Sequence, residues 1–373
     1  QALVLQQTPA QEHARREPHA DQVAGCDPVD MFTSMDGLTK RQLKGLFSSA
    51  QQDRLEEVER FVSKHGVGFV NQLKDGNGDV IFHRAARGGA EKVVDYLLEI
   101  CMADPNATNR VYKTPLHEAA AIGNVDIVIK LVSHGAALDG AKYNDWTALL
   151  YACEKGHVDV VKYLLEHLDH REAAFKERNR EGSSALYIAA RNGDTTLVSL
   201  LLSHGIDANI RNNNKRVPVH ACAMNGNWEA FIILIEAGAD VYAKDSSGTT
   251  VWHEAAQHGR YEFMKKLFDS GLVKDWSCDN NGRNMLHCAA REGKSDIAGL
   301  IIDFFEKQSA DNKCEFIQTK DIDGATPLHL ACVQGHPQVV RILLESGANP
   351  ASKCNAGKTG LEYATHWKRD NCV

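Results

Sequence analysis

Two copies of the sequence HEAA place a histidine beside a glutamate, a pairing that could support metal chemistry. His117-Glu118 lies in the stretch ATNRVYKTPLHEAA, and the pair recurs at 253–254. A zinc protease site of the HExxH type needs a second histidine four residues on, so that both imidazoles face one ion. The residues in that place are Ala121 and Gln257. The spacing excludes an HExxH site, and we expect no metal at either pair.

Other patterns that could do chemistry also fail on spacing. The tripeptide 357–359, Gly-Lys-Thr, matches the end of a phosphate-binding loop, but the glycine required five residues earlier is Ser352. His167 and His170 have no cysteine nearby and no third ligand. Neither a G-x-S-x-G elbow nor a G-x-G-x-x-G loop occurs. We therefore expect no catalytic residue and no cofactor, and the chain is predicted not to be an enzyme.

A glycine that recurs about every 33 residues predicts the helices that position these residues. Spacings of 34, 33, 37, 33, 33, 34 and 42 separate eight glycines, at positions 89, 123, 156, 193, 226, 259, 293 and 335. Apolar pairs follow each glycine at the spacing of one helix face, as in 93–94 and 97–98. A shorter segment with small residues, such as Ala119-Ala120, precedes it. The period predicts eight helix pairs, with glycine ending the first helix of each.

Residues 321–349, DIDGATPLHLACVQGHPQVVRILLESGAN, resemble the ankyrin repeat pattern D-x-x-G-x-T-P-L-H-x-A-A-x-x-G-H-x-x-V-V-x-L-L-L-x-x-G-A-D. The resemblance implies an all-α repeat solenoid, in which stacked helix-turn-helix pairs are linked by β-hairpin fingers. It also implies that the T-P-L-H histidine hydrogen-bonds between adjacent copies. Because a helix pair this short cannot bury its apolar face alone, the copies must stack into one continuous core.

Four regions are expected along the chain. They are a disordered segment at 1–37, a capping repeat at 38–74, eight ankyrin repeats at 75–352, and a partial capping repeat at 353–373. The first region scatters Gln, Pro, Glu and His without a period. The two longest spacings place inserts near 167–178 and 304–319, and we expect both inserts to form loops.

Composition limits the cellular compartments in which we expect the protein. The net charge is -7, and no run of about 18 apolar residues could span a membrane. Cys153, Cys222 and Cys332 stand where equivalent segments carry alanine, which is typical of small buried groups in a reducing compartment. We expect a cytoplasmic or nuclear protein without a membrane partner. Because the first residue is Gln1, the sequence is expected to be trimmed or taken from a longer chain.

The fingers of the second to fifth repeats carry an excess of cations. The windows 107–113, 140–146, 176–182 and 211–216 contain nine lysines and arginines but only three acidic residues. Charged tips are common on exposed turns, but one sign over four consecutive fingers favours electrostatic steering of a partner. Aromatic residues, which often anchor interfaces, are interleaved. The candidate partner-binding residues are Arg110, Tyr112, Lys113, Lys142, Tyr143, Trp146, Arg178, Arg180, Arg211, Lys215 and Arg216.

The leading prediction is a monomeric, non-enzymatic scaffold that binds a protein through its concave finger face. Nucleic acid is less favoured, because the chain is acidic overall and lacks a nucleic-acid-binding signature. Within the ankyrin family, residues 79–153 most resemble one particular member. That resemblance implies alanyl-tRNA synthetase as the partner and a role in translation fidelity. That resemblance also implies lysines that accept misactivated amino acids, although Arg180 stands where such a lysine is expected and arginine is not nucleophilic. A lysine-based acceptor and the ankyrin segment of a larger multidomain protein are the alternatives.

Overall fold

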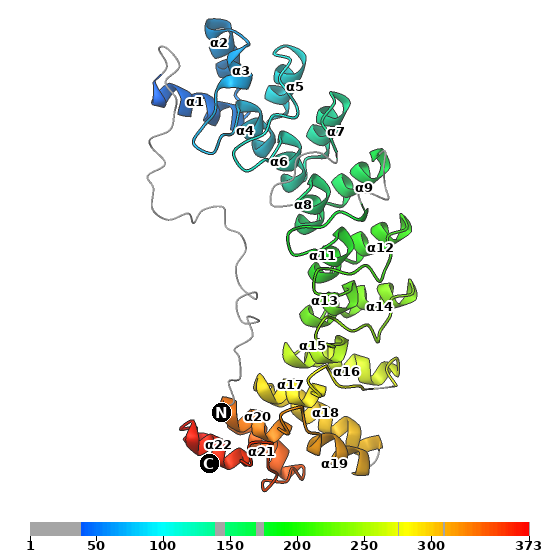
Figure 1. The fold of residues 1–373 in the computed structure, drawn as a ribbon. Coiled ribbons are helices and arrows are strands. Elements are labelled where there is room, and N and C mark those ends of the chain that lie inside the picture. Colours follow the sequence, from blue (N-terminus) through cyan, green and yellow to red (C-terminus); the bar gives the residue numbers. More distant parts are fainter. Residues whose placement is uncertain (1–38, 139–145, 169–174, 275, 309, 373) are drawn as a thin grey trace.

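A computed structural model of the protein describes residues 39–138, 146–168, 175–274, 276–308 and 310–372. Figure 1 shows helix pairs stacked into a long, curved array, with one row of helices along the concave side and a second row behind it. The prediction of an all-α repeat solenoid is confirmed. The segment 1–37, expected to be disordered, lies outside the described residues.

In the part of the chain that the structure describes, eight helix pairs form the body of the array. The inner, concave row comprises α4 (Ile81–Gly88), α6 (Pro115–Ile122), α8 (Ala148–Lys155), α11 (Ala185–Asn192), α13 (Pro218–Asn225), α15 (Val251–Gln257), α17 (Met285–Arg291) and α20 (Pro327–Gln334). The outer row comprises α5 (Glu91–Glu99), α7 (Val125–Ser133), α9 (Val158–His167), α12 (Thr195–Ser203), α14 (Trp228–Glu236), α16 (Tyr261–Ser270), α18 (Ser295–Gln308) and α21 (Pro337–Glu345).

Shorter units cover the two ends of the array. Before the first pair come α1 (Lys40–Gln51), α2 (Leu55–His65) and α3 (Phe69–Gln72), with α1 packed on α4 and α2 on α5. After the last pair come α22 (Gly360–His366), packed on α20, and the 3-10 turn η2 (Asp370–Cys372). None of the helices in the described residues is long and apolar enough to cross a membrane.

The predicted apolar pairs and glycines hold the stack together. Val93, Val94 and Leu97 on α5 are fully buried, their counterparts on the other outer helices are buried as well, and all belong to one continuous core. Gly123 and Gly226 cap α6 and α13 with φ of +80° and +82°. This left-handed conformation is costly for any residue with a β-carbon, which explains the recurrence of glycine.

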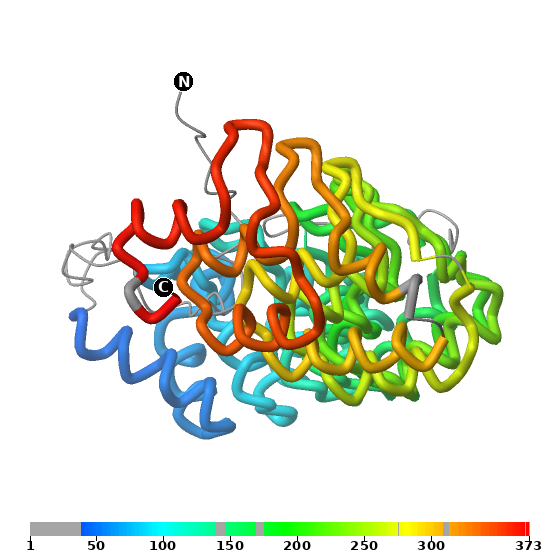
Figure 2. Tube along the Cα trace, turned by 90° about the horizontal axis from the view of Figure 1, so that it is seen from below, coloured from blue at the N-terminus to red at the C-terminus, as the bar shows by residue number. Residues whose placement is uncertain are grey.

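The fingers differ from the expected β-hairpins, because no strand is assigned to them within the described residues. Each described finger is a tight turn that a side chain closes. In one of them, Asp245 Oδ1 accepts hydrogen bonds from the backbone N–H groups of Ser247 at 2.8 Å and Thr249 at 2.9 Å. Such a turn lets the fingers of consecutive repeats project side by side in one direction, as Figure 2 shows for the C-terminal fingers.

The expectation of a loop at 304–319 is wrong. Helix α18 continues to Gln308, and a further helix, α19 (Ala310–Gln318), packs against it. The rings of Phe305 and Phe316 stack with centroids 4.1 Å apart, and Ile317 is buried. Apolar residues within the insert therefore extend the core. Part of the other insert, residues 169–174, lies outside the described residues.

Candidate protein-binding face

Histidines on six of the inner helices in the described residues connect these helices to the finger of the next repeat, and we call this set the histidine ladder. In six repeats the imidazole Nε2 lies 2.8–3.2 Å from a backbone carbonyl oxygen of the following finger. The Nδ1 atom accepts a hydrogen bond from the backbone N–H at the start of its own helix, as in His117 from Thr114 at 3.2 Å. Because a backbone N–H can only donate, Nε2 must carry the proton and donate to the carbonyl. The bonding between copies that the resemblance implied is present.

These histidines are buried and neutral. Burial lowers the pKa of His253 and His287 to about 4, although hydrogen bonds to backbone carbonyls oppose the shift. Both ring nitrogens of each are already occupied by the ladder. In the part of the chain that the structure describes, no group of three or more metal-binding side chains lies close enough to hold an ion.

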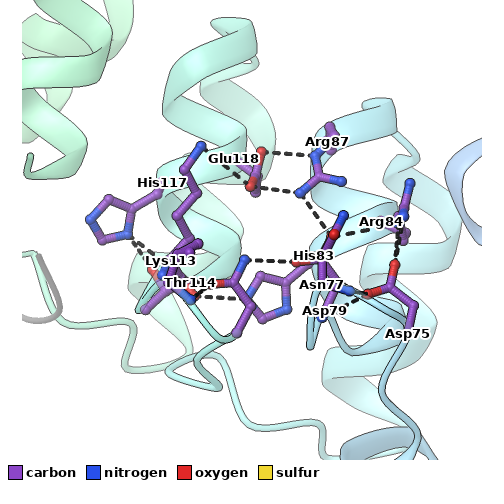
Figure 3. Close-up of polar contacts among 12 residues, drawn as sticks. Asp75, Asn77, Asp79, His83, Arg84, Arg87, Lys113, Thr114, His117 and Glu118 are labelled. Carbon is purple, nitrogen blue, oxygen red and sulfur yellow. Dashed lines mark hydrogen bonds and ion pairs between the residues drawn. The ribbon is translucent and has the colours of Figure 1, made fainter. Parts of the chain in front are cut away.

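The glutamate of the first HEAA sequence is part of a buried ion-pair network, shown in Figure 3. Glu118 lies in the first turn of α6, and its carboxylate accepts from Arg87 Nε at 3.0 Å and Nη2 at 2.8 Å. Lys113 Nζ lies 3.8 Å from the same carboxylate. Burial alone would raise the pKa of Glu118, but the bonds and charge of Arg87 outweigh burial and lower the pKa. Glu118 therefore joins the first repeat to the second.

The second HEAA sequence makes the corresponding connection further along the array. Glu254 Oε1 lies 2.5 Å from Arg216 Nη2, and Arg216 Nε donates to Asp245 Oδ2 at 3.2 Å. Here burial dominates and raises the pKa of Glu254, despite the charge of Arg216. Arg216, one of the candidate binding residues, is thus held by two carboxylates of the following repeat.

Three more candidates are half-buried and engaged inside the array. Lys113 Nζ lies 4.8 Å from the ring centroid of Tyr151, besides its pairing with Glu118. The indole of Trp146 contacts the same ring, with centroids 5.3 Å apart. Arg178 donates to the carbonyl oxygens of Phe175 at 2.9 Å and Glu177 at 2.8 Å. These contacts within the array explain why lysine, tryptophan and arginine stand at the three positions, and no partner protein is needed to explain them.

The remaining described candidates are exposed on the fingers, and these residues are Arg110, Tyr112, Arg180, Arg211 and Lys215. Arg110 Nη1 reaches the carbonyl oxygen of Gly76 on the preceding finger, at 2.8 Å. The side chain of Tyr112 is 67% exposed. Lys142 and Tyr143 lie outside the described residues. The structure thus divides the candidates into an exposed group and a group used in packing.

Two of the exposed candidates adopt an unfavourable backbone conformation. Tyr112 has φ of +62° and Lys215 has φ of +60°. In six other fingers the same position is glycine, at 78, 182, 248, 282, 324 and 357. A left-handed residue with a β-carbon costs about 1–2 kcal/mol. Sequence reasoning selected Tyr112 and Lys215 for ring and charge and missed this strain, which an alignment of the fingers at the glycine position could have revealed.

Comparisons with known proteins agree with this geometry. The family model described as Ankyrin repeats (3 copies) matches residues 82–174, 168–245, 242–313 and 304–373. SH3 and multiple ankyrin repeat domains protein 2 of Homo sapiens is 30% identical over 171 residues, which cover 46% of this chain and 9% of that protein. The nuclear factor NF-kappa-B p105 subunit of Gallus gallus is 27% identical over 332 residues, which cover 87% of this chain and 26% of that protein. The chain therefore spans about a quarter or less of the length of these two relatives.

A solved structure shares the arrangement of helices. The crystal structure of the human ASB11 ankyrin repeat domain matches with a TM-score of 0.52 and 25% sequence identity. The match covers 64% of this chain and 100% of that chain.

Proposed function

We propose that this chain, which belongs to the ankyrin-repeat family, is a scaffold whose protein partner docks on the exposed fingers. The single observation that carries the proposal is the strained backbone of Tyr112 and Lys215. Strain of this kind persists in folded proteins where the side chain has a role that glycine cannot fill. An exposed aromatic ring and an exposed cation on finger tips are suited to that role.

The charge of the exposed group sets the chemistry of the partner. Arg110, Arg180, Arg211 and Lys215 place cations on three fingers of a chain whose net charge is -7. A surface of one sign steers a partner of the opposite sign and fixes its orientation. The partner is an acidic protein surface, and binding weakens as salt is added.

The specific partner we propose is alanyl-tRNA synthetase. Residues 79–153 resemble ankyrin repeat domain-containing protein 16 in the segments GDxxxHxAAR, ATNRxYKxPLHEAA and KxxDWTxLxxAC, which occur here at 78–87, 107–120 and 142–153. That resemblance supports a role in translation fidelity, in the cytoplasm or the nucleus. None of the nine cysteines among the described residues forms a disulfide, which suits a reducing compartment.

The test reverses the exposed charges and leaves the packed ones intact. The variant R110E/R211E/K215E is titrated with purified alanyl-tRNA synthetase, because these three side chains are exposed. Lys113 and Arg216 are left unchanged, since Lys113 pairs with Glu118 inside the array and the pair of Arg216 with Glu254 joins two repeats. We expect affinity to fall by about tenfold or more.

The matched control makes the same change of charge on the outer helices. Lys92, Lys162 and Lys265 are exposed on α5, α9 and α16, and K92E/K162E/K265E should bind as the unmodified protein does. If the finger variant folds and binds the synthetase as tightly as this control, the proposed face is wrong.

A lysine-based acceptor of misactivated amino acids is the second candidate function. Lys215 favours it, because its amine is exposed on a strained finger tip. The ε-amino group would attack the aminoacyl-adenylate carbonyl, releasing AMP and leaving an amide on the lysine. Mass spectrometry after incubation with synthetase, serine and ATP tests this function. A protein without seryl adduct on any lysine rejects it and leaves the scaffold proposal standing.

A further inference from the structure

We propose that the partner also inserts one branched aliphatic side chain into a pocket at the C-terminal end of the concave face. This inference rests on the proposed function, because it assumes that an acidic partner occupies the fingers. A cavity of about 40 Å³ lies between α20 and α22, below the last two fingers. Ala325, Leu330, Val333, Tyr363 and Trp367 contribute its apolar lining.

Of the ionisable groups that line this cavity, His329, Asp321 and the Cys354–Tyr363 pair are engaged in hydrogen bonds, and Asp323 is half-exposed on its finger. His329 Nδ1 accepts from the backbone N–H of Thr326 at 3.2 Å, and Nε2 donates to the carbonyl oxygen of Lys358 at 3.2 Å. Asp321 Oδ2 accepts from Arg283 Nε at 3.3 Å, while Oδ1 accepts from backbone N–H groups of its own finger. With these groups engaged, an apolar ligand group suits the cavity better than a polar one.

The size of the cavity selects the kind of side chain. A space of about 10–15 Å³ holds one water-sized group, so about 40 Å³ accommodates several methyl-sized groups. The end of a leucine, isoleucine or valine side chain fits that description. The indole of Trp367 is 52% exposed, and Ile322, 63% exposed, lies on a finger that lines the cavity. Both leave apolar surface for the rest of the inserted residue.

The cationic fingers determine the kind of polypeptide segment to which the aliphatic side chain belongs. Three repeats separate the finger at 211–216 from the finger at 321–325. With about 10 Å between adjacent repeats, the separation is roughly 30 Å. An extended chain covers about 3.3 Å per residue, so about nine residues bridge it. The occupant is thus an extended acidic segment whose aliphatic residue lies about nine residues from its charges.

The experiment uses fluorescent peptides and the full chain. The first peptide carries five glutamates, a nine-residue Gly/Ser spacer and a leucine, and is made in both directions. A second replaces leucine by alanine, and a third replaces the glutamates by glutamines. We expect the alanine peptide to bind about tenfold more weakly than the leucine peptide in one direction, because it buries less apolar surface.

Protein variants locate the effect. Val333→Phe should fill the cavity and make both peptides bind equally weakly, and W367A, which opens the rim, should reduce the difference between the peptides. Val67→Phe, at a 50% exposed valine near α3, is the matched control and should leave the difference unchanged.

The outcomes separate the two proposals. If the leucine and alanine peptides bind the unmodified protein alike, or V333F and W367A both leave their difference intact, the pocket is overturned. If the glutamine peptide binds as well as the glutamate peptide, and R110E/R211E/K215E has no effect, the finger face fails, whatever the pocket does.

Discussion

At the scale of single residues, two finger tips have a strained backbone that lowers stability and carry side chains that we expect to bind the partner. Tyr112 and Lys215 occupy a position where glycine would relieve the left-handed strain of about 1–2 kcal/mol, offset partly by the greater backbone freedom of an unfolded glycine. We expect Tyr112→Gly to raise the free energy of unfolding by about 0.5–1 kcal/mol and to weaken partner binding. Urea unfolding and a partner titration measure the two effects.

The control for this change is Arg110→Gly, on the same finger. Arg110 is not among the described residues with positive φ, so the substitution should not stabilise the fold. A Tyr112→Gly variant that is less stable than the unmodified protein would contradict the strain argument.

The buried histidines make the stability depend on pH. His287 has a folded pKa of about 4 because of burial, below its unfolded value of about 6.5, so its neutral form is favoured by folding. The stabilisation is full above about pH 6.5 and is lost as the pH falls toward 4, by up to about 1.4 kcal/mol per pH unit. In urea unfolding at pH 7 and pH 5, we expect H287Q to be less stable at pH 7 but to lose less stability on acidification. An equal loss would show that His287 does not titrate on unfolding.

At the scale of the elements, one glycine is required for two reasons that a pair of variants can separate. Gly123 and Gly135 have φ of +80° and +86°. A Cβ at Gly123 would overlap the imidazole of His157 in the next repeat, whereas a Cβ at Gly135 would meet nothing within 4 Å. We expect Gly135→Ala to cost about 1–2 kcal/mol and Gly123→Ala about 1–3 kcal/mol more. Thermal or urea unfolding of both variants gives the difference, and equal losses would exclude the clash.

Periodicity predicted the helix pairs, because apolar spacing and glycine repeat in register in every copy. It could not predict α19, because the second insert interrupts the period, and the contacts of Phe316 and Ile317 with the core are visible only in the structure. The candidate site was predicted less completely, since a count of charges does not give side-chain direction. Lys113 and Arg216 end their fingers and turn toward Glu118 and Glu254, whereas Arg110 and Lys215 stay exposed.

At the scale of the whole molecule, the terminal unit protects the end of the stack. Helix α22 packs on α20, where Gly360 lies so close that an added Cβ would be 3.1 Å from Cys332 Sγ. We expect truncation after residue 352 to expose this apolar face, lower the melting temperature and increase binding of a hydrophobic dye. Removal of residues 370–373 alone, which takes away η2, is the control and should have a smaller effect. Equal melting temperatures for the full chain and the longer truncation would contradict a capping role.

In the repeats that have it, the histidine ladder also joins an inner helix to the next finger in the same way, however many residues lie between them. His253 reaches the carbonyl of Arg283, 30 residues on, and His287 reaches that of Ala325, 38 residues on, through the same kind of bond. The additional residues, α19 among them, fall between an outer helix and the next finger. Residues can therefore be added to one unit, by duplication or lengthening of its outer part, behind the concave face and without a change in how the inner helix meets the next finger. A ligand that spans several fingers then keeps its contacts with them.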